Sequence, residues 1–348
     1  MTLNEAPKAF GAGLIALDLV LGMDPAAPVK SWTGGTCGNV LSILAFLGWK
    51  SFPIARMNGD AASKRVLADL AKWGVQLDFA QCEPTGHTPI IVQQIKSDRD
   101  GNPTHKFLWA CPSCGKHLPR FKAITQAAVT VVAPHMEDAS VFFMDRLSRA
   151  MLTLAKLAFD NGAVVIFEPS AKSDPKHFAE ALEIAHILKY ADQRLADAGN
   201  VLNDNSSVLL EIQTLGEHGL RYRSKTDGTV QPWTPMSAFQ SIRLEDTCGS
   251  GDWCTAGIIH KLAAGGFESF SKLGPEDFSE ALTFGQGLAS WNTRFEGARG
   301  GMYSMTFGEF EEQVSDILGG DVRSLPEKPM SRDVQESVDC PACASQAA

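Results

Sequence analysis

A β-α-β pattern in the middle of the chain constrains the fold more than any other sequence feature. The apolar runs Val141 to Met144 and Ala163 to Phe167 are typical of short buried strands, and Arg149 to Phe159 between them has helical periodicity. Strands that are joined through a helix run parallel, whereas tight turns join antiparallel strands. The pattern therefore predicts an α/β protein with a mainly parallel sheet.

Strands and helices are expected to alternate along most of the chain. The other expected strands are Phe10 to Leu17, Phe52 to Met57, Val75 to Ala80 and Ser207 to Gln213. The expected helices are Asn39 to Trp49, Ala61 to Trp73, His177 to Ala185, Gly251 to Ala264 and Pro275 to Phe295. Two more strand-like runs, Pro89 to Ile95 and His105 to Ala110, flank an Asp-Gly turn and predict a β-hairpin.

Composition excludes several classes of function. The 348 residues carry a formal net charge of -9, whereas a nucleic-acid binder needs a surplus of Lys and Arg. No apolar run reaches the roughly 18 residues that span a bilayer. The segment Gly11 to Gly22 also lacks the basic leader and cleavage site of a signal peptide. We therefore expect a cytoplasmic protein that binds neither nucleic acid nor membranes.

The segment Asp246 to Asp252, Asp-Thr-Cys-Gly-Ser-Gly-Asp, stands directly before a helical run. Small residues at a helix start let backbone N–H groups and the helix dipole hold an anion. Asp252 at this position can take a proton from a hydroxyl that attacks a phosphoryl group. The turn therefore predicts phosphoryl transfer, and the alternative is a glycine-rich helix cap without chemistry.

This turn resembles the second signature of the ribokinase-like (PfkB) family of carbohydrate kinases, Asp-Thr-x-Gly-Ala-Gly-Asp, with Ser250 in place of alanine. Three further segments resemble family motifs in the same order. They are Gly13 to Asp18 (first strand), Gly34 to Asn39 (first signature) and Thr214 to Gly219 (nucleotide-binding turn). The resemblance spans about residues 9–310. It implies a three-layer α/β/α sandwich over 1–318, with a small β lid that includes about 88–110 and a C-terminal tail at 319–348.

The resemblance also implies a reaction and a role for each matching residue. The reaction is ATP-dependent phosphorylation, with Mg²⁺, of a hydroxyl on a sugar or nucleoside. Asp252 resembles the catalytic base, and Gly249, Ser250 and Gly251 resemble the anion hole. The residues that resemble substrate contacts are Asp18, Gly34, Gly35 and Asn39, and those that resemble ATP contacts are Thr214, Gly216 and Gly219. Lids in this family often pair, so a homodimer through the lid is compatible with the resemblance.

One motif of the family, Asn-x-x-Glu, is replaced. In the matching segment, Ala191 stands for the asparagine and Arg194 for the glutamate. Arginine cannot bind a cation but can contact a phosphate. Glu168, at the end of an expected strand, is the candidate for a water-mediated magnesium contact, and Asp192 is a second candidate or a solvated surface charge. The replacement leaves Asp252 untouched, so we still expect an active kinase. The alternative that it raises is a catalytically weak ligand-binding or regulatory protein on the kinase fold.

Two tryptophans near the expected lid, Trp32 and Trp109, either line the substrate pocket or pack within the lid and core. Aromatic side chains pack throughout proteins, so packing is the favoured interpretation.

Four of the eight cysteines form two Cys-Pro-x-Cys pairs, Cys111 with Cys114 and Cys340 with Cys343. Such turns are typical of zinc knuckles, and in a reducing compartment paired cysteines more often hold metal than form disulfides. The pairs predict one structural zinc that pins the tail to the base of the lid; a redox pair, a chance recurrence and His117 as a substitute ligand are alternatives. The remaining cysteines, Cys37, Cys82, Cys248 and Cys254, are expected to be small buried residues.

Overall fold

The computed structural model describes residues 5–24, 27–99, 103–170, 174–195, 198–203, 206–226, 228–240 and 243–321. Cys340 and Cys343 lie outside these residues, as does the tail from residue 322 onward. No helix within the described residues has both the length and the apolar character needed to cross a membrane.

The larger sheet has the strand order β13-β12-β11-β10-β9-β8-β1-β4-β5, with β14 beside β12. The strands from β11 to β5 all run parallel, and β12 is antiparallel to β11. The bounds are β1 (Lys8–Ala12), β4 (Lys50–Met57), β5 (Ala80–Cys82), β8 (Val141–Met144), β9 (Val164–Phe167), β10 (Ile187–Ala191), β11 (Leu210–Thr214), β12 (Leu220–Thr226), β13 (Thr229–Val230) and β14 (Thr234–Met236). The predicted mainly parallel sheet is confirmed.

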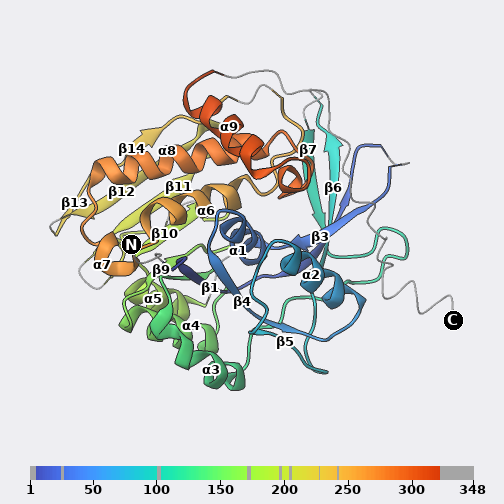
Figure 1. The fold of residues 1–348 in the computed structure, drawn as a ribbon, viewed down its shortest axis with the longest axis horizontal. Helices are drawn as coiled ribbons and strands as arrows, with labels where there is room; N and C mark the ends of the chain where they lie inside the picture. Colours follow the sequence, from blue (N-terminus) through green and yellow to red (C-terminus); the bar gives the residue numbers. More distant parts are fainter. Residues whose placement is uncertain are drawn as a thin grey trace.

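Helices cover both faces of this sheet, because successive side chains of a strand point to opposite sides. In β8, Val141 and Phe143 join the core beneath one group of helices, whereas Phe142 and Met144 join the core beneath the other. The first group is α1 (Thr36–Phe46), α2 (Ala61–Lys72), α6 (Ser250–Leu262), α7 (Gly266–Phe270), α8 (Pro275–Asn292) and α9 (Phe307–Leu318). The second group, α3 (Gln126–Val132), α4 (Arg149–Asp160) and α5 (Pro175–Ile184), lies together in Figure 1. The predicted three layers are therefore present.

A smaller sheet with the order β3-β2-β6-β7 lies beside this sandwich (Figure 1). Its strands are β2 (Ala16–Leu21), β3 (Lys30–Gly34), β6 (Ile90–Ser97) and β7 (Pro103–Leu108). The antiparallel pairing of β6 with β7 confirms the predicted hairpin. The parallel pairing of β2 with β6 carries Asp18 into this small sheet, which places a predicted substrate contact on the lid side of the molecule.

The prediction of one strand from Phe10 to Leu17 is wrong, because the chain changes sheets within that run. It leaves the large sheet after Ala12 and enters the small sheet at Ala16. Gly13 lies in the connection, where a Cβ atom would come within 1.7 Å of Oδ1 of Asp145. The apolar run is continuous because the residues on both sides of this change of sheet are buried.

Other expectations also differ from the structure. The predicted strand Val75 to Ala80 is wrong, because the edge strand β5 occupies Ala80–Cys82. Cys82 is exposed rather than buried, whereas Cys37, Cys248 and Cys254 are buried as expected. Strand β10 and helices α3 and α9 were not anticipated.

Candidate active site

The carboxyl ends of the parallel strands carry polar side chains to one edge of the large sheet. Asp145 follows β8, Glu168 follows β9, Asp192 follows β10, and Thr214 ends β11. Open α/β sheets bind ligands in the crevice outside this edge. Three of these four residues were singled out from the sequence; Asp145 was missed.

The glycine-rich turn before α6 has a backbone shape that only glycine can adopt without strain at Gly249. Gly249 has a φ of 76°, and a Cβ atom there would lie 2.3 Å from the carbonyl oxygen of Ala298. The buried Asp246 carboxylate accepts the backbone N–H groups of Cys248 and Gly297, each at 2.9 Å. Because helix starts leave N–H groups without intrahelical partners, this fixed turn can cradle an anion.

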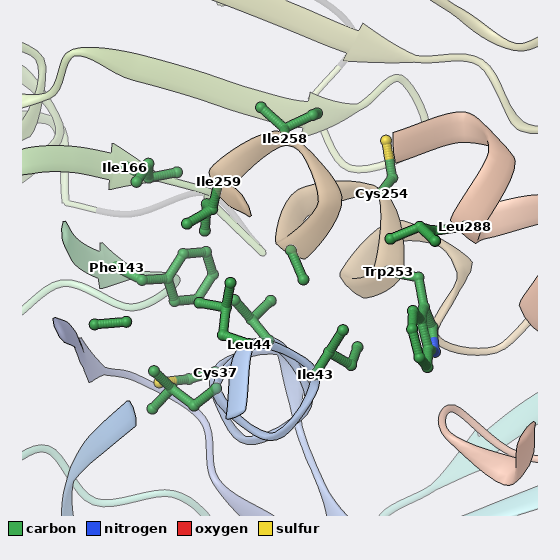
Figure 2. Close-up of a cluster of buried hydrophobic side chains, with 14 of the residues drawn as sticks. Cys37, Ile43, Leu44, Phe143, Ile166, Trp253, Cys254, Ile258, Ile259 and Leu288 are labelled. Carbon is green, nitrogen blue, oxygen red and sulfur yellow. The ribbon is translucent and has the colours of Figure 1, made fainter. Parts of the chain in front are cut away.

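Asp252 lies in the first turn of α6 and contacts Asn39, the last residue of the segment that resembles the first signature. Nδ2 of Asn39 donates a hydrogen bond to Oδ2 of Asp252 at 2.6 Å. Asn39 belongs to α1, which packs against α6 through Ile43, Leu44, Trp253 and Ile259 (Figure 2). Two motifs that are far apart in the sequence are thereby brought into direct contact by helix packing.

The environment of Asp252 suits a group that exchanges a proton near neutrality. Burial raises the pKa of Asp252 to about 7, and the neighbouring Glu168 carboxylate acts in the same direction. The hydrogen bond from Asn39 opposes this rise, as do the positive charges of Lys189 and Arg194. The carboxyl group therefore gains a proton far more readily than an exposed aspartate.

Asp18 faces the same space from the small sheet. Its Oδ2 lies 1.8 Å from where a Cβ atom of Gly34 would stand, so the glycine makes room for the carboxylate. Burial raises the pKa of Asp18 to about 7, although Arg299 and the backbone N–H of Gly35 favour its charged form. Oδ1 of Asp18 is buried and has no hydrogen-bond partner among the described residues. Such an atom needs a partner, and a substrate hydroxyl would supply one.

A buried ion pair underlies the glycine-rich turn. Nζ of Lys189 lies 2.8 Å from Oε1 of Glu168 and donates to the carbonyl oxygen of Gly251 at 3.2 Å. The hydroxyl of Thr255 donates to Oε2 of Glu168 at 2.6 Å. Glu168 is therefore at the site, as its place after β9 predicted, with both oxygens hydrogen-bonded to protein groups.

The predicted nucleotide-binding turn connects β11 to β12. The backbone N–H of Leu215 donates to the carbonyl oxygen of Gly219 at 2.8 Å. Gly219 has a φ of 89°, and a Cβ atom there would meet the carbonyl oxygen of Met236 at 2.1 Å. The N–H of Asp192 donates to the carbonyl oxygen of Thr214 at 3.1 Å, which joins this turn to the end of β10. The exposed Arg194 follows there and interacts electrostatically with Asp252.

The two tryptophans differ in their surroundings. Trp32 is 4% exposed and stacks on Tyr303 with ring centroids 5.0 Å apart, which agrees with the packing interpretation. Trp109 is 44% exposed.

The first cysteine pair lies on a tight turn directly after the hairpin. The backbone N–H of Gly115 donates to the carbonyl oxygen of Cys111 at 2.8 Å. The N–H of Cys111 donates to the carbonyl oxygen of Lys116 at 2.9 Å. Within the described residues, no cluster of three or more His, Cys, Asp or Glu side chains could hold a metal ion. The second cysteine pair lies outside those residues.

Sequence reasoning missed two buried cations at the site, Lys189 and Arg299. A sequence pattern could have identified Lys189, because this lysine interrupts an otherwise apolar strand and a buried lysine in a strand needs an acidic partner. Arg299 had no local signal, since its partners Thr33, Asn39 and Asp69 are 230 to 266 positions away in the sequence.

Solved structures with the same fold include sugar and nucleoside kinases. Ribokinase from Arabidopsis thaliana, solved with ribose and ATP, has a TM-score of 0.66 at 18% identity and covers 90% of this chain and 99% of its own. Fructokinase from Xylella fastidiosa with bound ATP has a TM-score of 0.67 at 15% identity, over 90% and 98% of the two chains. The nucleoside kinase of Burkholderia thailandensis in complex with inosine has a TM-score of 0.64 at 17% identity, over 90% and 97%.

The sequence comparisons assign the chain to a family. No curated protein sequence matches it. The model of the pfkB family carbohydrate kinases, however, matches residues 23–304, which is most of the chain. Together with the parallel sheet and the Asn39–Asp252 contact, this match shows that the chain belongs to the pfkB family of carbohydrate kinases.

Proposed function

We propose that the protein transfers the γ-phosphate of ATP to a hydroxyl group of a sugar or nucleoside. Asp252 takes the hydroxyl proton as the acceptor oxygen attacks the γ-phosphorus. The bond from that phosphorus to the bridging oxygen breaks, and ADP leaves. The observation that carries the proposal is the 2.6 Å hydrogen bond between Asn39 and Asp252, which joins a hydroxyl-binding amide to a carboxyl group whose pKa is about 7.

The acceptor is held by the groups that face Asp252. Asp18 has a buried oxygen that lacks a partner among the described residues, and Asn39 offers an amide beside Asp252. A carboxylate and an amide bind neighbouring hydroxyls through paired hydrogen bonds, which suits ribose, hexoses and nucleosides alike. Gly34 shapes this pocket by leaving space for Asp18, and the backbone N–H of Gly35 forms a hydrogen bond that favours the charged form of Asp18. The ribose and inosine in related structures are consistent with such acceptors.

The phosphate groups are held on the other side of Asp252. The N–H groups of Gly249, Ser250 and Gly251 stabilise the transferred phosphate as negative charge develops on its oxygens. The turn that contains Thr214, Gly216 and Gly219 binds the nucleotide, and Arg194 contacts its phosphates in place of the missing glutamate. Magnesium would neutralise the phosphate charge. Carboxylate oxygens suit it, and Glu168 would contact it through water by accepting a second hydrogen bond at either oxygen.

A substrate screen tests this function. The full chain is incubated with labelled ATP, Mg²⁺ and a panel of sugars and nucleosides, and the products are separated. We expect a phosphate ester of at least one acceptor, formed together with an equal amount of ADP. Absence of any phosphorylated acceptor across the panel would contradict the proposal.

The alternative is a catalytically weak binding or regulatory protein. Ala191 and Arg194, which replace the Asn-x-x-Glu residues, favour it. Calorimetry distinguishes the two functions, because this alternative predicts tight binding of sugar and nucleotide with turnover that stays near background.

We also propose one structural Zn²⁺ held by Cys111, Cys114, Cys340 and Cys343. The tight turn that carries the first pair supports the proposal, since zinc knuckles present two thiolates from such turns. Elemental analysis of the purified chain should find one zinc, and it should be lost in the double variant Cys340→Ser, Cys343→Ser. A wild-type chain without zinc would refute the site.

A homodimer through the lid stays a proposal. The apolar side chains Phe107 and Trp109, 39% and 44% exposed, lie on or beside β7 and support it. Light scattering should give the mass of a dimer, and Phe107→Glu should reduce it to that of a monomer. A monomeric wild type would exclude this interface. A cytoplasmic location likewise stays a prediction, to be tested by cell fractionation.

A further inference from the structure

A fully buried arginine lies directly behind the acceptor pocket. Arg299 is 0% exposed and precedes the short 3-10 helix Gly300–Tyr303. Its Nε donates to Oδ1 of Asn39 at 3.1 Å, and its Nη2 donates to the carbonyl oxygen of Thr33 at 2.6 Å. The Asn39 amide is therefore bound on one side by Arg299 and on the other by Asp252.

The other end of this arginine is held by a second buried charge. Asp69 of α2 is 1% exposed, and its Oδ2 lies 2.8 Å from Nη2 of Arg299. Asp69 also accepts the N–H of Thr33 at 2.8 Å and the hydroxyl of Tyr303 at 2.8 Å. Charge-assisted bonds of this kind leave the guanidinium plane little freedom. A continuous chain of contacts thus runs from Asp69 through Arg299 and Asn39 to Asp252.

The donor and acceptor chemistry of this chain determines which way the amide points. An arginine side chain has five donors and no acceptor, whereas an amide has one acceptor oxygen and one donor nitrogen. The amide oxygen of Asn39 must therefore face Arg299. Its nitrogen consequently faces Asp252 and donates to the carboxylate. With the amide reversed, two donors would meet at Arg299 and two acceptors would meet at Asp252.

We propose that Arg299 is a positioning residue for phosphoryl transfer, which fixes the Asn39 amide so that it binds the acceptor and holds Asp252 in line with it. The inference rests on the proposed kinase function. The charge of Arg299 serves the same pocket, because it favours the ionised form of Asp18, and its Nη1 is buried with no partner among the described residues. The acceptor hydroxyls thereby meet a carboxyl group whose ionised form Arg299 favours and a correctly oriented amide.

The test compares Arg299→Lys and Arg299→Gln in wild-type and Asn39→Ala backgrounds. Lysine retains the charge but not the planar fork, so Arg299→Lys should lower kcat at least about tenfold through misplacement of Asn39. In the Asn39→Ala background, the same change should lower kcat by less than about twofold, because its route to Asp252 is already removed.

The pH profile separates the role of charge from that of geometry. Loss of the positive charge in Arg299→Gln raises the pKa of Asp18, so the acid limb of kcat/KM should move to higher pH. Arg299→Lys should leave that limb in place. The titratable groups facing this arginine are Asp69 of α2, Tyr303 and Asp18, and both variants retain all three.

Arg294→Lys is the matched control. Arg294 is 8% exposed, lies in the same C-terminal segment and interacts electrostatically with Asp316 of α9 instead. It should keep the wild-type kcat and pH profile. Melting curves identify variants that fail to fold, and Arg299→Lys, which retains the charge, carries the test if Arg299→Gln does not fold.

Two results would overturn the role of Arg299 while leaving the kinase function intact. The first is a folded Arg299→Lys with wild-type kcat. The second is an equal loss of kcat in both backgrounds, which would mean that the arginine acts on overall stability rather than through Asn39. A wild-type chain without turnover on any acceptor would instead refute the kinase function, and the assigned role with it.

Discussion

The two sides of Asp252 differ in how their charges are compensated. On the acceptor side, Arg299 and Asp69 are buried, and the hydrogen bonds of Arg299 to Asn39 and to Asp69 hold them in one arrangement. On the phosphate side, the exposed Arg194 follows the end of β10 and interacts electrostatically with Asp252. The comparison indicates that the charges of the acceptor pocket are fixed by contacts within the protein, whereas Arg194 is exposed and in the proposed function would bind a nucleotide phosphate.

The glycine-rich turn lies between the two sides, so its disruption should have the largest effect. Gly249→Ala places a Cβ atom 2.3 Å from the carbonyl oxygen of Ala298 and strains a φ of 76°. The turn must then move, and kcat should fall by roughly 10²-fold, as for other small displacements of catalytic groups. Gly308→Ala, where a Cβ atom meets nothing within 4 Å, should leave kcat unchanged. Equal effects of the two changes would show that the shape of the turn is not required.

Breaking the buried ion pair of Lys189 and Glu168 beneath the turn should lower stability more than breaking a surface pair. Lys189→Met leaves Glu168 buried without its cation and should lower the free energy of unfolding by about 3–5 kcal/mol. Lys156→Met removes the exposed pair with Asp160 and should cost less than about 1 kcal/mol. Denaturant unfolding measures both changes. Similar losses for the two variants would contradict the distinction between buried and exposed pairs.

Arg194→Ala should affect one side of the site alone. Loss of a charged contact to a nucleotide phosphate should raise KM for ATP about tenfold, with the affinity for the acceptor unchanged. Arg149→Ala, on α4 in an exposed pair with Glu180, is the control and should change neither constant. An increase of KM for the acceptor, with KM for ATP unchanged, would show that Arg194 acts on the acceptor side and would contradict the proposed phosphate contact.

The smallest expected effect is a shift in the pH dependence of kcat. Because the pKa of Asp252 is raised to about 7 and a base must be deprotonated, kcat should rise with pH through about 7. The hydrogen bond from Asn39 favours the charged carboxylate, so Asn39→Ala should move this limb to higher pH. A wild-type limb near the pKa of an exposed aspartate, about 4, would show that burial does not control the base.

Local patterns were sufficient to predict the sheet and the glycine-rich turn. The β-α-β run over β8, α4 and β9 is fixed by apolar periodicity, and the turn before Asp252 is a contiguous motif. The continuous apolar run from Phe10 to Leu17 predicted one strand, although the chain changes sheets at Gly13. Burial on both sides of that change leaves one uninterrupted hydrophobic signal.

The charge network behind the site was not predictable in this way. Arg299 is separated from Asn39 by 260 positions, and only the completed fold brings them together. Strand β10 was missed because the lysine in its apolar run was not recognised as a buried cation, and its partner Glu168 lies 21 positions away. Sequence therefore predicts the residues that act on substrate better than the residues that hold them in place.

The central claim is that Asp252 removes the proton from the acceptor hydroxyl. The most direct test is the kcat of Asp252→Asn, measured with an acceptor found in the screen and with acceptor binding followed separately by calorimetry. The asparagine keeps the size of the side chain and can still contact Asn39, so binding should persist. We predict a fall in kcat of about 10²-fold or more. A kcat near the wild-type value, with the acceptor still bound, would contradict the account.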